Sequence, residues 1–156
     1  MWWSIAHGRG AADRGWSSRA PSWESARAAY RHACAKTIEA GWFALVEERA
    51  HALGLTTAGH LPGEESYLGH AHLMGDVFAM LTHFDVPGYD IISSNLPDGI
   101  NRGQATGAKV VQSSGWLQGK STMVEAFGAH GFALDLQKQH STLAWLACHD
   151  LFRIFD

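Results

Sequence analysis

The sequence predicts an α/β fold in which helices alternate with short parallel strands. Three observations predict it. The first two are that apolar residues recur at helical spacing in several segments and that short apolar runs, too brief to be helices, separate these segments. A third is that the helix-then-strand pattern repeats every 30 to 40 residues or so, as in βαβ units, so that three or four such units are expected. A closed (β/α)8 barrel needs roughly 250 residues, whereas this chain has 156. The pattern therefore indicates a small open sheet or a partial barrel.

The chain is expected to divide into an irregular segment, residues 1–25, and a folded domain, residues 26–156. The first segment mixes glycine, serine, arginine and tryptophan without a sustained period. Residues 26–53 carry the longest amphipathic helical pattern, and Gly54 is its expected C-terminal cap. A short strand at 55–59 is then predicted to deliver His60 and a loop that holds Glu64 and Glu65.

The same alternation continues to the end of the chain. Residues 66–83 return to helical spacing, weakened by Gly69 and Gly75. Pro87 and Gly88 predict a turn over 85–90, followed at 91–92 by a short strand or a strand-end loop. A helix within 103–119, a buried strand at 122–124, a helix at 135–147 and a strand at 151–155 complete the prediction.

Glu125 is expected at the point where the buried strand 122–124 becomes a loop, because Gly128 and Gly131 follow it. In α/β architectures ligands gather at the carboxyl ends of strands, where the βα loops converge. Glu125 is therefore a candidate functional carboxylate. The alternative is a solvated side chain at a strand end.

Composition narrows the class of partner. The net charge is −3 with a pI near 6.3 and no run of basic residues, so nucleic acid is not an expected partner. No apolar run approaches the roughly 20 residues of a membrane span, and the two cysteines, Cys34 and Cys148, form neither a disulfide framework nor a zinc motif. The compartment is not encoded in these features.

Five short motifs, in their order along residues 26–155, resemble the catalytic barrel of glycoside hydrolases of the α-L-rhamnosidase class, in particular family 106 and its relatives. The motifs are Thr-Ala-Gly-His-Leu at 57–61 with Glu64, Gly-Asp at 75–76, Val-Pro-Gly-Tyr-Asp at 86–90, Ala-Lys at 108–109 with two serines at 113–114, and Glu-Ala-Phe-Gly-Ala at 125–129 with Gly-Phe at 131–132. Such proteins are large, mostly bacterial, often periplasmic or secreted enzymes that cleave terminal deoxy-sugars from plant glycans. The resemblance implies a fragment from the middle of the barrel, and it implies calcium as a cofactor.

Glycoside hydrolysis uses one carboxylic acid to protonate the leaving oxygen and one carboxylate to activate water or attack the sugar. The resemblance makes Glu64 the preferred general acid, with Glu65 as the second choice, and Glu125 the base or nucleophile. Glu64 and Glu125 are about two βα units apart, so both would project from one rim of a barrel. Whether the reaction retains or inverts configuration depends on the distance between the carboxyl groups, which the sequence does not supply.

Four further residues are candidate substrate contacts. His60 would hydrogen-bond a sugar hydroxyl or orient Glu64, and Asp90, like Asp85 at the other end of the predicted turn, would bind hydroxyls or calcium. His130 and Trp116 are weaker candidates, Trp116 as a stacking face. Each has a purely structural alternative, and none is assigned as a metal ligand.

Two other functions remain open. His70, His72 and Asp76 form an HxH-x3-D cluster that would suit a metallohydrolase, although two residues apart on a helix the histidines face different directions. The other is an inert α/β fragment that self-associates or is completed by missing barrel segments, because unpaired sheet edges favour association.

Overall fold

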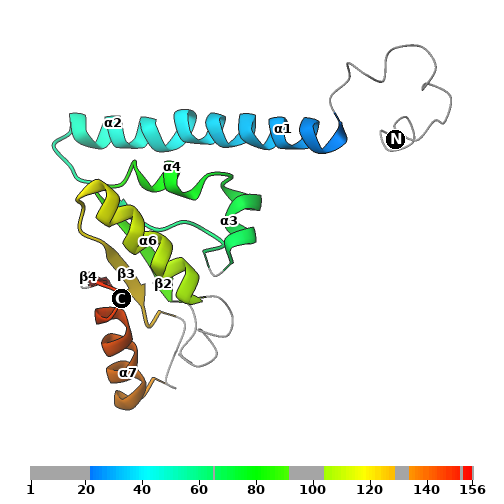
Figure 1. The fold of residues 1–156 in the computed structure, drawn as a ribbon. Helices are drawn as coiled ribbons and strands as arrows, with labels where there is room; N and C mark the ends of the chain where they lie inside the picture. The colour runs from blue at the N-terminus through cyan, green and yellow to red at the C-terminus, as the bar shows by residue number, and fades with distance from the viewer. Residues whose placement is uncertain (1–21, 65, 92–103, 129–133, 152, 156) are drawn as a thin grey trace, which may run out of the picture. The chain divides into compact units, whose positions relative to one another are not determined.

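The computed structural model describes residues 22–64, 66–91, 104–128, 134–151 and 153–155. The chain is a mixed α/β protein, which confirms the predicted class (Figure 1). Its elements are α1 (Trp23–Ile38), a π-helical turn η1 (Glu39–Phe43), α2 (Ala44–Ala52), β1 (Ala58–Gly59), α3 (Tyr67–Leu73), α4 (Val77–Leu81), β2 (Val86–Ile91), α6 (Gln104–Gln118), β3 (Met123–Ala126), α7 (Leu136–Ala147) and β4 (Arg153–Phe155).

Internal contacts divide the chain into two units, Met1–Ala33 and Cys34–Asp156. The described part of the first unit is the beginning of α1. There the Ser22 hydroxyl accepts a hydrogen bond from the backbone N–H of Ser25 at 3.2 Å, and the Arg27 guanidinium lies 4.7 Å from the centroid of the Trp23 ring. These are a helix N-cap and a cation–π contact. The second unit holds the sheet and all of the other elements that follow.

The strands are all parallel and stand side by side in chain order, β1-β2-β3-β4. The ladder is continuous through β2, β3 and β4, whereas β1 pairs only with the first two residues of β2, Ala58 with Val86 and Gly59 with Pro87. In the centre of the sheet Gly88 pairs with Met123 and Asp90 with Glu125. Register partners on parallel strands point their side chains to the same face.

The two faces of the sheet differ in what covers them. The helix face consists of Tyr89, Ile91, Val124 and Ala126, and these residues belong to one buried core with apolar side chains of α4, α6 and α7. A Cβ atom on Gly107 of α6 would collide with the Tyr89 ring, so α6 lies directly against this face, as Figure 1 shows.

The opposite face, here the site face, consists of Gly88, Asp90, Met123 and Glu125. None of these residues belongs to the core cluster, although Met123 is buried, with its side chain close over Gly88. The alternation of the two strands therefore places two carboxylates on the face that α6 does not cover.

One strand was mispredicted. Residues 86–90 were expected to form a turn, but they are most of β2. The Pro-Gly pair is tolerated because Pro87 is only the second residue of β2 and the pairing with β3 begins after it, at Gly88. The missing proline N–H thus lies at the start of the strand. Sheet pairing and the burial of Tyr89 thus override the local turn signal.

The predicted helices exist but differ in extent. The helix expected from residue 26 begins at Trp23, and it contains the π-helical turn. The single helix expected over 66–83 is two helices, α3 and α4, because Gly75 adopts φ +79° between them and Asp76 caps α4 by accepting from the Ala79 N–H at 3.1 Å. Asp135 caps α7 in the same way, through the Lys138 N–H at 2.8 Å.

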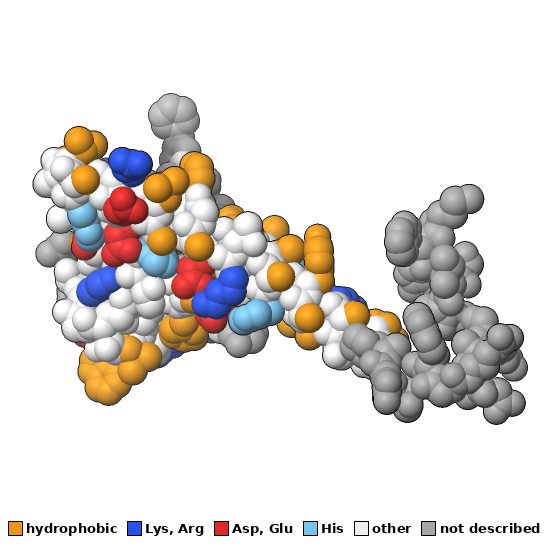
Figure 2. All heavy atoms as spheres, turned by 90° about the horizontal axis from the view of Figure 1, so that it is seen from above, with side chains coloured by type: hydrophobic (Ala, Val, Ile, Leu, Met, Phe, Trp, Pro, Cys, Tyr) orange, Lys and Arg blue, Asp and Glu red, His pale blue; other side chains and the backbone are white. Residues whose placement is uncertain are grey.

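Among the described residues, no helix has both the length and the apolar character that crossing a bilayer requires. Figure 2 shows acidic, basic and histidine side chains interspersed among apolar ones over the coloured residues, without a continuous basic patch on the face in view.

Candidate active site

Three ionisable side chains meet at the carboxyl ends of three successive strands. His60 directly follows β1, Asp90 is the penultimate residue of β2 and Glu125 is the penultimate residue of β3. One nitrogen or oxygen atom from each lies within 4.8 Å of the others. Parallel pairing in chain order brings them together, because consecutive strands end at the same edge of the sheet. Glu125 thus lies at the carboxyl end of its strand, where the sequence predicted it.

Glu64 contacts two members of this cluster, His60 and Asp90. Its side chain is 3% exposed, and its Oε1 atom accepts a hydrogen bond from the Asp90 N–H at 2.6 Å. The backbone N–H of Leu61 also stabilises its charged form. The loop after β1 and the end of β2 are therefore joined through one buried carboxylate.

His60 connects the two glutamates. Its Nδ1 atom lies 3.0 Å from Glu64 Oε1, an ion-pair contact rather than a well-aligned hydrogen bond, and its Nε2 atom is hydrogen-bonded to Glu125 Oε2 at 3.1 Å. With both ring nitrogens facing carboxylates, the doubly protonated imidazolium is the form that satisfies both contacts. The carboxylates of separate βα units thus share one cation.

The surroundings of His60 favour its charged form. The contact with Glu64 is the largest cause that raises the pKa of His60 to about 9, the charges of Asp90 and Glu125 add to it, and partial burial opposes it. Burial raises the pKa of Glu64, while His60 and the backbone amides of Asp90 and Leu61 oppose that rise. A buried carboxyl group with a raised pKa retains a proton to higher pH than a solvated one.

Glu125 differs from Glu64 in exposure, since 46% of its side chain is accessible. Two residues further on, Phe127 adopts φ 77°, which is unusual for a bulky side chain. Such strained conformations cluster at functional sites, where the surrounding structure enforces them. Phe127 packs against the core, which holds the end of β3 in place.

No protein-family model, curated protein or solved structure matches this chain. The chemistry of the site is therefore argued from its own geometry.

The calcium implied by the rhamnosidase resemblance can be tested against these residues. Calcium takes six to eight oxygen ligands, and the cluster offers carboxylates from Asp90 and Glu125 together with a histidine nitrogen. Calcium prefers oxygen ligands, so the His60 nitrogen adds little to these two carboxylates. The cluster therefore offers fewer oxygen ligands than a calcium ion takes, and it does not fit calcium.

The remaining predicted site residues divide into two groups. Glu65 and His130 lie outside the described residues, so their places in the site stay predictions. Trp116 is described, but it lies near the C-terminal end of α6, beside residues that precede β3 and not beside the carboxyl end that holds Glu125. Trp116 thus lies apart from the His60 cluster, and its role as a stacking face stays a prediction.

The metal cluster suggested by the HxH-x3-D motif does not form within the described part of the chain, where the three-residue ligand set is His60, Asp90 and Glu125. His70 is buried and His72 is exposed on α3, while Asp76 caps α4. Asp85 is also engaged elsewhere, because its Oδ2 atom accepts from the Thr57 N–H at 2.6 Å and contacts His51 at 2.9 Å.

The role of the Asp90 and Leu61 backbone amides was not predicted from the sequence. Every non-proline residue carries an N–H, so no residue type signals which amide will hold a carboxylate. The i, i+4 spacing of His60 and Glu64 is a signal that could have indicated their contact. From the sequence, His60 was predicted only to hydrogen-bond a sugar hydroxyl or to orient Glu64.

Proposed function

We propose that the chain is a sector of a (β/α)8 barrel that carries the acid and the base of a glycoside hydrolase, of the α-L-rhamnosidase class that its motifs resemble. One observation carries the proposal: Glu64 and Glu125, from separate βα units, contact opposite nitrogens of His60 at the carboxyl edge of a parallel sheet. Paired carboxylates at strand ends are the arrangement that sugar cleavage requires.

The strand order supports a barrel sector. In a (β/α)8 barrel the strands stand in chain order, the helices cover the outer face and the inner face carries the functional side chains at its carboxyl end. Here the strands stand in the order β1-β2-β3-β4, α6 covers the helix face, and Asp90 and Glu125 lie on the site face. The site face would be the barrel interior.

The different environments of the two glutamates suggest their roles. A general acid needs a raised pKa and a base needs an ionised, accessible carboxylate, so pairs whose surroundings differ in this way are typical of acid and base partners. Burial raises the pKa of Glu64, whereas Glu125 is exposed. His60, 30% exposed and in contact with both glutamates, would hold the two carboxylates in position relative to each other.

Asp90 supplies the fourth group of the proposed site. Its carboxylate lies within hydrogen-bonding range of a sugar hydroxyl placed over the cluster, because its ligand atom is within 4.8 Å of those of His60 and Glu125. The substrate class is a carbohydrate with a terminal deoxy-sugar, which follows from the resemblance alone.

The test is hydrolysis of p-nitrophenyl α-L-rhamnoside by the purified chain and by Glu125→Gln and Glu64→Gln. Loss of an acid or a base removes about a hundredfold or more in rate. Glu48→Gln, an exposed carboxylate on α2, is the matched control and is expected to retain full turnover. Undiminished turnover by Glu125→Gln would remove Glu125 from the mechanism.

A second candidate is an inert fragment completed by another chain or segment. Parallel sheets are normally covered on both faces, and β1 and β4 are the edges of this sheet. A folded chain that releases no nitrophenol and elutes as a larger species in gel filtration would favour this alternative. A monomer that turns over the rhamnoside would exclude it.

A further inference from the structure

A hollow of about 560 Å³ lies at the opposite end of β3 from Glu125, where α6 ends and the chain enters the strand. It is lined by Gln112, Ser113, Trp116, Lys120, Ser121 and Asp150 among others. None of the lining residues takes part in the His60 cluster. Its volume is within the roughly 300–1,000 Å³ typical of small-molecule sites.

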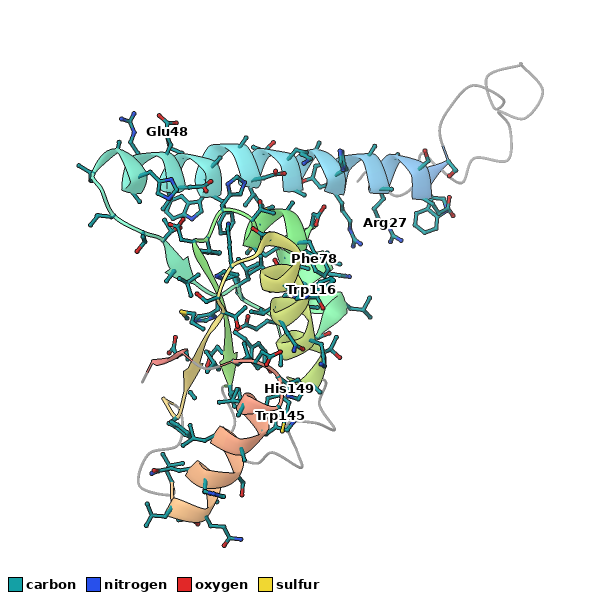
Figure 3. The ribbon with its side chains drawn as sticks, turned by 60° about the vertical axis from the view of Figure 1, so that its left-hand side comes forward. Arg27, Glu48, Phe78, Trp116, Trp145 and His149 are labelled. Atoms are coloured by element: carbon teal, nitrogen blue, oxygen red, sulfur yellow. The ribbon has the colours of Figure 1, made fainter. Side chains whose placement is uncertain are left out.

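Trp116 provides this hollow with an aromatic wall. The side chain is 81% exposed, although tryptophan is the residue with most to gain from burial. Figure 3 shows it on α6, which ends two residues later at Gln118. An exposed ring beside a hollow is a flat apolar surface available to a ligand.

The polar groups around the ring are held in place by hydrogen bonds. Lys120 Nζ donates to the backbone carbonyls of Thr82 at 2.7 Å and Phe84 at 2.8 Å. Gln112 Nε2 donates to Asp150 Oδ2 at 2.9 Å, which leaves the other Asp150 oxygen for a further donor. Pre-positioned donors and acceptors reduce the entropy lost when a ligand binds.

The charges of the hollow indicate a neutral ligand. Lys120 and Asp150 carry opposite charges, and the other lining groups are hydroxyls, an amide and an indole. Neither a phosphate nor a metal cation finds an excess of complementary charge in this lining. An apolar ring with hydrogen-bonding groups of both kinds suits a molecule with one apolar face and many hydroxyls.

We propose that this hollow is a second carbohydrate-binding site, which takes a neutral mono- or disaccharide on the Trp116 ring. It is separate from the proposed catalytic cluster and would hold a sugar without cleaving it. The proposal does not depend on the proposed hydrolase function, since the two sites share no residue.

The experiment follows indole N–H signals by NMR while the purified chain is titrated with cellobiose or methyl α-L-rhamnoside. The Trp116 signal, assigned by its loss in Trp116→Phe, is expected to shift saturably with a Kd on the order of 1 mM. Trp116→Ala is expected to weaken binding about tenfold or more, which is roughly 1.4 kcal/mol. Trp42→Ala is the matched control because Trp42 is also exposed, at 65%, but lies on η1 outside the hollow.

Three results would overturn the proposal. The first is the absence of a saturable shift of the Trp116 signal with both sugars, and the second is undiminished binding by Trp116→Ala. The third is tighter binding of glucose 6-phosphate than of either neutral sugar, which would indicate an anion site. Glu125→Gln should leave these titrations unchanged, so failure of the hydrolase proposal and failure of this one are distinguishable.

Discussion

The buried carboxylate of Glu64 accepts the backbone N–H of Asp90 at 2.6 Å and thereby joins the loop after β1 to the neighbouring strand β2. Asp90 in turn pairs in register with Glu125 on β3. Glu64 therefore joins the first two strand ends of the proposed site directly, and the third follows through the pairing of Asp90 with Glu125. Its removal is expected to affect stability as well as chemistry.

Glu64→Ala should lower the free energy of unfolding by about 1–3 kcal/mol, because it leaves the Asp90 N–H without its acceptor in a buried position. Glu64→Gln keeps an acceptor oxygen and should cost less. Urea unfolding measures both, and the exposed Glu48→Ala should stay within about 0.5 kcal/mol of the parent chain. Equal effects of Glu64→Ala and Glu48→Ala would show that the contact with Asp90 contributes nothing.

The raised pKa of His60, about 9, predicts a loss of stability at alkaline pH. A group with a raised folded pKa contributes its full stabilisation below its unfolded pKa of about 6.5, and loses it as the pH rises through the folded value. Urea unfolding between about pH 6 and pH 10 should therefore show a decline that His60→Gln lacks. Parallel pH profiles for the two proteins would contradict the assignment.

Asp85 predicts a separate transition in acid. The Thr57 N–H, followed by the contact with His51, lowers the pKa of this carboxyl to about 2. A depressed pKa gives stability that is present above the unfolded value of about 3.9 and is lost as the pH falls through the folded value. Asp85→Asn should remove that part of the acid dependence between about pH 4 and pH 2. Thermal unfolding followed by circular dichroism measures this dependence. If Asp85→Asn loses stability in acid to the same extent as the parent chain, the prediction is refuted.

Two glycine substitutions test the packing of α6 on the helix face. Gly107→Ala would place a Cβ against the Tyr89 ring and the Glu64 carbonyl, so it should destabilise the chain by about 1–3 kcal/mol. Gly41→Ala, in η1, meets nothing within 4 Å and should be neutral or stabilising by up to about 1 kcal/mol. Chemical unfolding of both variants gives the comparison. A well-tolerated Gly107→Ala would mean that α6 does not approach β2 this closely.

Because the His60, Asp90 and Glu125 cluster offers fewer oxygen ligands than calcium takes, chelation by EDTA should leave the melting temperature unchanged. Added calcium should leave it unchanged as well, since a ligand stabilises only the state that binds it. Zinc tests the alternative use of His60, Asp90 and Glu125, because a neutral imidazole with two carboxylates is a plausible zinc ligand set. If zinc raises the melting temperature of the parent chain but not that of His60→Gln, His60 is a zinc ligand and not an imidazolium.

Local patterns determined the order of the elements and the position of one candidate site residue. Periodicity located α6 and α7, and Glu125 was singled out because a buried run of apolar residues ends there. Hydrophobic spacing is a property of neighbouring residues, so it can be read without the tertiary structure. The parallel sheet followed from the alternation of helices and strands.

Tertiary structure alone decided which side chains meet. The turn predicted at Pro87 and Gly88 is part of β2 because pairing with β3 outweighs local propensity. Trp116 belongs to a hollow at the other end of the strand from Glu125. The contact of His60 with Glu125, 65 residues away in sequence, depends on strand register, which is set by long-range pairing and burial and not by any local pattern.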